Sequence, residues 1–349
     1  MRSPAAAARP PAGPERRSAG ASGDVAGKRA VLMTGASGYI AGQLLDEFRR
    51  EFDLRLVDVT ETDRGGRRVP GVVVADLTDP DRTRYQSLFA GVDAVVHLGY
   101  RPPGHAGGAE DVPPGDRFET EFANVRMAQN VYRAAYDAGV RRVVAASSNH
   151  AADWYEHALV HARGRELVSP DDPPLSDNFY GWAKACYELL GFVYASGAFG
   201  RKLEVVQVRI GAPRDVSGAH YEGPLREQHV GPGGSGLANF KRDLGAWVSE
   251  RDLRQLFRRS IETPRIENEH GVPWLVVYGV SDNTRAFWSL ESARRVLGYR
   301  PQDDSEVRYA DDVRRLLTGP GVGAPGGRLG APAGEAPGAG PRRSRPPEP

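Results

Sequence analysis

Short apolar segments alternate with helical patterns along most of this 349-residue chain. Strand-like apolar runs fall at residues 31–34, 54–57, 72–75, 94–99, 142–148, 203–211 and 274–280. Helical patterns are expected at 40–48, 80–89, 117–138, 178–195 and 290–297, and one more helix is expected after a cap at Ser249. Parallel strands need helical connections, so this alternation predicts an α/β fold with a doubly wound parallel sheet covered by helices on both faces.

Two long segments interrupt the alternation. Residues 100–116 follow the fourth strand and residues 212–238 follow the sixth, and both are rich in Gly and Pro. The first is far longer than a usual strand-to-helix connection, which indicates either a lid over a substrate or irregular surface. Both chain ends lack the apolar residues that ordering needs. We therefore expect one folded domain over 28–317, with substrate-binding elements in about 212–300, between a disordered extension (1–27) and a disordered Gly/Pro-rich tail (318–349).

Charge and cysteine content narrow the class of protein. The formal net charge is +1, which gives no support for binding nucleic acid or a membrane surface. No apolar run approaches the length of a membrane span, and the N-terminus lacks the apolar core of a secretory signal. Its Ala- and Arg-rich composition is shared with transit peptides, but a disordered extension of a cytoplasmic protein is the favoured interpretation. Cys186 is the only cysteine, which excludes an intramolecular disulfide, and no spacing of Cys, His or acidic residues indicates a metal site.

The first strand ends in a glycine turn of a kind that holds phosphates. Gly35 and Gly38 would let the backbone turn sharply, and the amides of the helix that follows would face a pyrophosphate. The second strand ends in Asp58, where a carboxylate that binds a ribose belongs. The glycines alone would also suit an ordinary strand-to-helix turn, but together with Asp58 they predict a dinucleotide site.

A tyrosine and a lysine four residues apart carry the candidate catalytic chemistry. Tyr180 and Lys184 lie on one face of the helix expected at 178–195. An ammonium beside a phenol favours the phenolate, which can take a proton from a substrate hydroxyl while a hydride leaves the same carbon. A hydroxyl at a neighbouring strand end, such as that of Ser148, would hold the substrate oxygen. The spacing alone arises by chance in many helices, but here the chain order places all these groups at one sheet edge, where ligands bind in doubly wound folds.

These features resemble the extended short-chain dehydrogenase/reductase family, the NAD-dependent epimerases and dehydratases, over about residues 29–307. Within this family the chain looks most like the uronate dehydrogenases. The narrower likeness rests on segments 54–59, 97–99, 142–150, 180–184, 208–211 and 277–283. The Ser-Ser-Asn-His end of the fifth strand and the Tyr-Gly-x-Ser-Asp-Asn segment are more selective than the family-wide Thr-Gly-x-x-Gly and Tyr-x-x-x-Lys. The resemblance implies a Rossmann-like fold with a small C-terminal substrate-binding region.

The resemblance also implies roles for individual residues. Tyr180 would be the general base, Lys184 would be its pKa partner and a ribose ligand, and Ser148 would hold the reacting oxygen. The cofactor would be NAD rather than NADP, since a 2′-phosphate would meet the charge of Asp58. Cofactor contacts would come from Gly35, Ser37, Gly38, Tyr39, Ile40, Asp58, Val59, Asp76, Leu77, Leu98, Gly99, Asn124 and Lys184. Substrate contacts would come from Ser148, Asn149, His150, Tyr180 and Arg242, whose guanidinium suits a substrate carboxylate.

Three departures from the family pattern are visible. The family's third glycine is Ala41 here, which affects cofactor binding little. The substrate-contacting serine after the Arg-Ile-Gly strand is Ala212, which removes a hydroxyl from the expected sugar site. The loops after His97 and Ala212 are also longer than in compact relatives. Cofactor chemistry is therefore better supported than substrate identity.

Several of these residues have simpler interpretations. His150 would also suit a strand end where a backbone carbonyl satisfies it, and Arg242 would also suit a solvated loop. His97 is expected to pack near the cofactor rather than transfer protons. Arg209 lies in an apolar strand, so it is expected to pair with a buried carboxylate or with carbonyls.

The leading hypothesis is an NAD-dependent oxidoreductase that oxidises a sugar or sugar-acid hydroxyl. In the uronate case the C1 hydroxyl of the cyclic sugar would react and the product would be a lactone. One alternative is a sugar-nucleotide epimerase or dehydratase that recycles NAD within a turnover. Another is an NAD-binding sensor or scaffold without turnover, which would have no use for Ser148, Tyr180 and Lys184 together. A homodimer is possible, because the family often pairs through the helices after the fourth and fifth strands.

Overall fold

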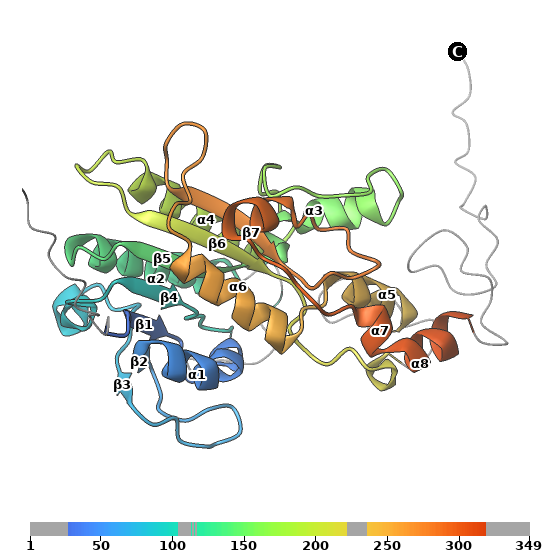
Figure 1. The fold of residues 1–349 in the computed structure, drawn as a ribbon, viewed down its shortest axis with the longest axis horizontal. Helices are drawn as coiled ribbons and strands as arrows, with labels where there is room; N and C mark the ends of the chain where they lie inside the picture. Colours follow the sequence, from blue (N-terminus) through green and yellow to red (C-terminus); the bar gives the residue numbers. More distant parts are fainter. Residues whose placement is uncertain (1–26, 104–112, 114, 116, 222–235, 319–349) are drawn as a thin grey trace, which may run out of the picture.

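Seven parallel strands form one sheet in the computed structural model, which describes residues 27–103, 113, 115, 117–221 and 236–318. The strands are β1 (Ala30–Thr34), β2 (Asp53–Asp58), β3 (Val72–Val74), β4 (Ala94–His97), β5 (Arg142–Ser148), β6 (Glu204–Ile210) and β7 (Trp274–Gly279). Their order in the sheet is β3-β2-β1-β4-β5-β6-β7, so Val31 of β1 lies between Leu54 of β2 and Ala94 of β4. The strand order reverses between β1 and β4, which confirms the predicted Rossmann-like, doubly wound sheet (Figure 1).

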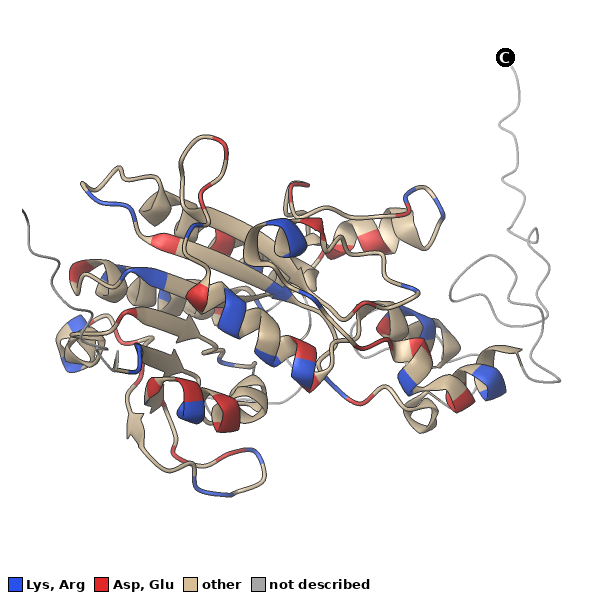
Figure 2. Ribbon diagram, in the orientation of Figure 1, with Lys and Arg blue, Asp and Glu red and all other residues tan. Residues whose placement is uncertain are grey.

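Helices cover both faces of this sheet. The helices α2 (Phe118–Asp137) and α4 (Phe179–Ala195) pack on one face, and α1 (Tyr39–Glu51) and α6 (Glu250–Glu262) pack on the other. Alternate strand residues supply the two cores, Leu32, Val95, Val143 and Val205 to the first and Val31, Met33, Val96 and Val144 to the second. Charged residues lie mostly on the helices and loops around the largely uncharged strands (Figure 2).

The helix predicted at 80–89 is wrong. Two short 3₁₀ turns, η1 (Arg82–Arg84) and η2 (Gln86–Phe89), take its place. The side chain of Asp79 accepts a hydrogen bond from the amide of Asp81, and that of Asp81 accepts one from the amide of Thr83. Such local side-chain bonds compete with the helical hydrogen-bond ladder. At 290–297 the predicted helix ends at Gly298 as expected, but its last part is a wider π-helical turn, η8 (Ala293–Leu297).

The sequence pattern missed several short elements beyond the ends of β5 and β6. After β5 come η4 (Asn149–Ala152), α3 (Asp153–Tyr155) and η5 (Glu156–Val160). After β6 come η6 (Gly218–His220) and α5 (Leu237–Ala246), and the described chain ends in α7 (Ser305–Arg308), α8 (Ala310–Val313) and η9 (Arg314–Thr318). Apolar residues of these last elements and of the segment after β6 form a small separate core. Its buried residues are Val216, Tyr221, Phe240, Leu244, Trp247, Tyr309 and Leu317.

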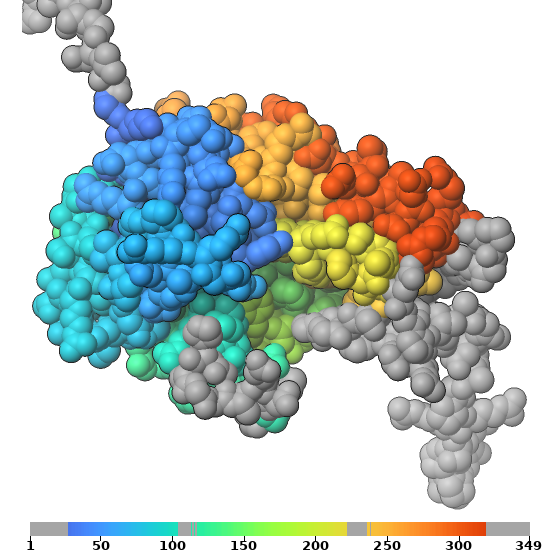
Figure 3. All heavy atoms as spheres, turned by 90° about the horizontal axis from the view of Figure 1, so that it is seen from below, coloured from blue at the N-terminus to red at the C-terminus, as the bar shows by residue number. Residues whose placement is uncertain are grey.

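The segment after β6 lies against the N-terminal part of the chain. Tyr39 and Gln43 of α1 both donate hydrogen bonds to the carbonyl of Pro213, at 2.8 and 2.9 Å. Figure 3 shows the two regions, blue and yellow, in contact on one face. The ends predicted to be disordered, 1–27 and 318–349, lie outside the described residues except for Gly27 and Thr318, and so does most of the two long loops. Among the described helices, none is long and apolar enough to cross a membrane.

Candidate active site

The glycine turn after β1 brings the backbone close to the end of β4. Gly35 has a φ of +68°, and a Cβ there would lie 2.7 Å from the amide nitrogen of Gly99, so only glycine fits. Gly38 is the N-cap of α1, and no side chain caps the amides of that helix end. Uncapped amides at a helix N-terminus attract phosphate groups. The turn therefore has the cradle that a pyrophosphate needs.

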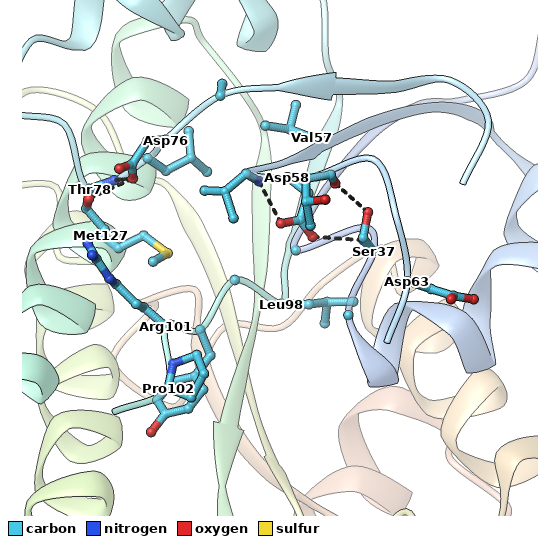
Figure 4. A pocket seen from close by; sticks show the side chains of 18 of the residues that line it. Ser37, Val57, Asp58, Asp63, Asp76, Thr78, Leu98, Arg101, Pro102 and Met127 are labelled. Carbon is cyan, nitrogen blue, oxygen red and sulfur yellow. Dashed lines mark hydrogen bonds between the residues drawn. The ribbon is translucent and has the colours of Figure 1, made fainter. Parts of the chain in front are cut away.

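The carboxylate of Asp58 lies against this turn. It accepts hydrogen bonds from the amides of Ser37 and Val59, at 2.8 and 2.6 Å (Figure 4). The two bonds hold the carboxylate at the end of β2, beside a cavity of about 540 Å³, a size typical of ligand sites. Nine of the predicted cofactor residues line this cavity, namely Gly35, Ser37, Gly38, Asp58, Val59, Asp76, Leu77, Leu98 and Gly99. The residues present fit a dinucleotide whose ribose diol meets Asp58.

A second cavity of about 950 Å³ adjoins the first and shares Gly35, Gly38 and Leu98 with it. It is lined by Ser148, His150, Tyr180 and Lys184, and also by the predicted cofactor residues Tyr39 and Ile40. The structure thus brings the predicted catalytic residues together at the C-terminal edge of the sheet. Ala212 is fully buried and does not line this cavity.

Asn124 lines neither cavity. Its side chain binds the backbone of Arg101 on both sides, accepting from the amide at 2.8 Å and donating to the carbonyl at 2.9 Å. Asn124 therefore fixes the start of the loop after β4. Its predicted contact with a cofactor stays a prediction.

Tyr180 is positioned by the way α4 begins. Asn178 caps the helix by accepting a hydrogen bond from the amide of Gly181 at 2.9 Å. A Cβ on Gly181 would lie 2.0 Å from the carbonyl oxygen of His150, so glycine lets α4 approach the end of β5. The ring of Tyr180 then stands edge-on to that of His150, with 5.6 Å between the ring centres.

Burial dominates the protonation of the catalytic pair. It raises the pKa of Tyr180, although a hydrogen bond with Ser148 acts to lower it. Burial also lowers the pKa of Lys184 to about 8. The Lys184 ammonium donates to the carbonyl of Ala146 at 2.9 Å and lies 5.7 Å from the centre of the Tyr180 ring. The lowered tyrosine pKa that the sequence predicted is therefore not found in the protein alone, because burial raises the pKa of Tyr180 and the charges of Glu121 and Asp153 raise it further.

Polar residues that the sequence pattern did not single out surround His150. The Nδ1 atom of His150 lies 2.8 Å from a carboxylate oxygen of Asp153, which also accepts from the Asn178 side chain at 2.7 Å. His157 pairs with Asp177 at 2.8 Å at the mouth of the second cavity. The only sequence signal is spacing: Asp153 follows His150 by three residues, and His157 follows Asp153 by four. Such spacing places side chains on one face only where the segment is helical, and the sequence did not predict a helix at 149–160.

The sequence indicates no metal site, but three of these polar side chains lie close together. One potential ligand atom from each of Asp153, His157 and Asp177 lies within 4.8 Å of the others. One oxygen of Asp153 is already used by His150 and Asn178. His157 and Asp177 line the second cavity, whereas Asp153 is fully buried and holds the His150 ring.

The sequence predicts that Arg242 contacts the substrate. In the structure, however, Arg242 is not among the residues that line the second cavity. Its side chain is only 9% exposed, and its Nε and Nη2 atoms donate to both carboxylate oxygens of Glu156, at 2.8 and 3.2 Å. Its Nη1 atom donates to Asp243 at 2.9 Å. The missed segment η5 supplies Glu156, which explains why the sequence alone gave Arg242 no protein partner.

The buried partner predicted for Arg209 is confirmed, whereas the packing of His97 near a cofactor stays a prediction. Arg209 forms a two-bond pair with Glu188, at 2.8 and 2.7 Å. The Nδ1 atom of His97 lies 2.7 Å from the Thr34 hydroxyl, and burial lowers the pKa of His97 to about 3. His97 is therefore neutral near pH 7 and packs beside the turn without titrating.

The fold and the paired cavities are those of an NAD-dependent oxidoreductase. The model of the NAD dependent epimerase/dehydratase family matches residues 31–233, and the chain belongs to this family, whose cofactor is NAD. It is 32% identical over 292 residues to the NAD-dependent glucose-6-phosphate dehydrogenase of Haloferax volcanii, covering 79% of this chain and 94% of that protein.

Uronate dehydrogenases are also among its relatives. The enzyme of Pseudomonas syringae pv. tomato is 31% identical over 279 residues, which cover 79% of this chain and 83% of that protein. A crystal structure of a mutant uronate dehydrogenase from Agrobacterium tumefaciens complexed with NAD aligns with a TM-score of 0.58 and 25% identity, covering 84% of this chain and 91% of that one. The chain is thus an extended short-chain dehydrogenase/reductase of the uronate dehydrogenase-like group.

Proposed function

We propose that this protein oxidises the C1 hydroxyl of a cyclic sugar or sugar acid and releases a lactone. The observation that carries this proposal is the meeting of Ser148, Tyr180 and Lys184 in a cavity that adjoins the dinucleotide cavity. The named substrates of the two relatives, glucose 6-phosphate and a uronate, are both sugars with an oxidisable C1 hydroxyl. Asp58 favours NAD over NADP because its carboxylate would repel a 2′-phosphate.

The residues of the second cavity divide the chemistry among them. Ser148 holds the C1 oxygen by a hydrogen bond, and the phenolate of Tyr180 takes the hydroxyl proton. When bound, NAD accepts the hydride that leaves C1. The ammonium of Lys184 stabilises the negative charge on the Tyr180 oxygen and reaches the cofactor ribose. His150, on the same cavity wall, contacts the other sugar hydroxyls. Asn149 is buried outside the cavity lining, so its contact with a sugar remains a prediction.

The dinucleotide site is expected to extend beyond the nine residues that line the first cavity. Tyr39 and Ile40 stand at the N-terminus of α1, where their amides would meet the phosphates. Asn124 would act through the loop that it holds.

The test is NADH formation over a panel of aldoses, uronic acids and sugar phosphates, with NAD or NADP, for the wild type and Tyr180→Phe. The proposal expects steady NADH release with NAD, lost in the variant while NAD binding is kept. Tight NAD binding with no net NADH on any sugar would contradict it and would favour an epimerase that recycles its cofactor, or a sensor.

A further inference from the structure

A buried ion pair lies directly behind the expected sugar site. Glu156 is fully buried, and the guanidinium of Arg242 grips its carboxylate with two hydrogen bonds. Although burial alone would raise the pKa of Glu156, the Arg242 charge holds that pKa well below its usual range. Nε2 of His161 lies 3.1 Å from the same carboxylate. Glu156 is therefore ionised at neutral pH and fixed from two sides.

The remaining donors of Arg242 are also occupied. Nη1 donates to Asp243, whose carboxylate also accepts from Arg214 at 2.6 Å and from Tyr221 at 2.7 Å. With its amide oriented so that both polar atoms are satisfied, Asn149 accepts from Nη2 of Arg242 at 2.7 Å and donates to the carbonyl of Ile210 at 3.0 Å. Arg242 thus touches a proposed sugar contact while its fork is filled by protein groups.

A guanidinium binds a carboxylate best through two parallel hydrogen bonds, and Glu156 already makes both. A sugar acid would have to displace Glu156 and leave its carboxylate buried without a partner, which is strongly unfavourable. The pair also cancels the positive charge that would otherwise attract an anionic substrate.

Other charges on the described cavity wall do not replace this fork. Lys184 is bonded to the carbonyl of Ala146, and Arg64 lies over the Tyr39 ring on the cofactor side. Arg117 lies close enough to Glu121 to act on the pKa of that carboxyl, which burial raises. Asp177, on the same wall, offers no positive charge, because its carboxylate pairs with His157.

We propose that Glu156 is a specificity residue that occupies the Arg242 fork as an internal carboxylate, so that the protein oxidises uncharged aldoses in preference to sugar acids. The inference rests on the proposed function and names its substrate class. Polar partners for the hydroxyls of a neutral sugar are present on the same wall, in Ser148 and His150.

The first test compares matched substrates for the wild type, glucose with glucuronate and galactose with galacturonate. We expect kcat/KM to be at least about tenfold higher for each neutral sugar, the size of effect that one lost charged contact produces. Glucuronate should also inhibit glucose oxidation only at concentrations well above the KM for glucose. A wild type that prefers the uronates or glucose 6-phosphate would overturn the assignment but leave the proposed function intact. A wild type that oxidises no sugar would overturn both.

The second test removes the negative charge from the side chain that occupies the fork. Glu156→Gln keeps the size of the side chain and removes its charge, so we expect kcat/KM for glucuronate to rise about tenfold while that for glucose changes by less than about threefold. Glu166→Gln removes an exposed carboxylate ten residues further along the chain and should change neither. Adding Arg242→Gln to Glu156→Gln should abolish the gain. A Glu156→Gln protein that melts and binds NAD like the wild type but gains no uronate activity would contradict the proposal; if the variant does not fold, the wild-type preferences and the inhibition by glucuronate decide.

Discussion

Tyr180 shows how strongly its surroundings set the behaviour of a single side chain. In the protein alone its pKa is raised by burial, and the ammonium of Lys184 is bonded to a backbone carbonyl. A base with a raised pKa is deprotonated only as the pH rises. We therefore expect kcat/KM for sugar oxidation to increase with pH above neutrality.

Replacing Tyr180 by Phe removes the proton acceptor and leaves the ring. Loss of a general base costs about 10²- to 10⁴-fold in rate, and we expect kcat to fall in that range. The measurement is NADH formation together with NAD binding by fluorescence titration. Unchanged kcat in a folded variant would exclude Tyr180 as the base.

Asp58 gives a second prediction for a single residue. Its carboxylate is held by the amides of Ser37 and Val59 and faces the expected ribose. Asp58→Asn removes the charge, so kcat/KM with NAD should fall about tenfold and NADP should become a usable cofactor. Asp63→Asn alters another carboxylate of the same cavity and serves as the control. Equal effects of the two variants would contradict a specific role for Asp58.

Among the elements, α4 is the one whose start most directly sets the site. Gly181→Ala would place a Cβ 2.0 Å from the His150 carbonyl, so helix and strand end must separate. We expect a loss of about 1–3 kcal/mol in unfolding free energy, typical of overpacking, and a fall in kcat. Gly42→Ala in α1 is the matched control, because a Cβ there meets nothing within 4 Å and alanine favours helix. Denaturant unfolding of both variants checks this, and equal stabilities would contradict it.

The elements also show what the sequence could and could not predict. All seven strands were predicted, because each contains a run of apolar residues, as the strands of parallel sheets usually do. Even the edge strand β3 keeps such a run, although Val73 and Val74 are exposed. The segment 149–160 was missed because it consists of three short turns without a clear apolar stripe. Glu156 and Asp153 therefore entered the site unforeseen, and the prediction for Arg242 lacked its partner. The Gly35 turn and the Tyr180–Lys184 pair were predictable because each is marked by a short residue pattern that can be recognised within a few positions of the sequence.

For the whole molecule, buried His97 makes stability depend on pH. Above pH 6.5 the residue is neutral in both the folded and the unfolded chain. Between 6.5 and its folded pKa of about 3, the unfolded chain binds a proton that the folded chain does not. Stability therefore falls as the pH drops through this window, by up to about 1.4 kcal/mol per pH unit from this group.

Unfolding free energies of the wild type and His97→Gln at pH 4 to 7 test this dependence. The unfolding free energy of His97→Gln should depend less steeply on pH than that of the wild type, by the equivalent of close to one bound proton. His270→Gln, which alters an exposed histidine, should keep the wild-type dependence. Identical slopes for the wild type and His97→Gln would contradict a neutral buried His97.

The central claim is that a hydride leaves C1 of a sugar while Tyr180 takes the hydroxyl proton. The most direct measurement uses aldoses and uronates carrying deuterium at C1, with NAD, and follows both the reduced cofactor and the sugar product by NMR. The account predicts deuterium on the nicotinamide of the reduced cofactor, a lactone as the first product and no transfer with Tyr180→Phe. Deuterium retained in the sugar of a turned-over substrate would contradict it.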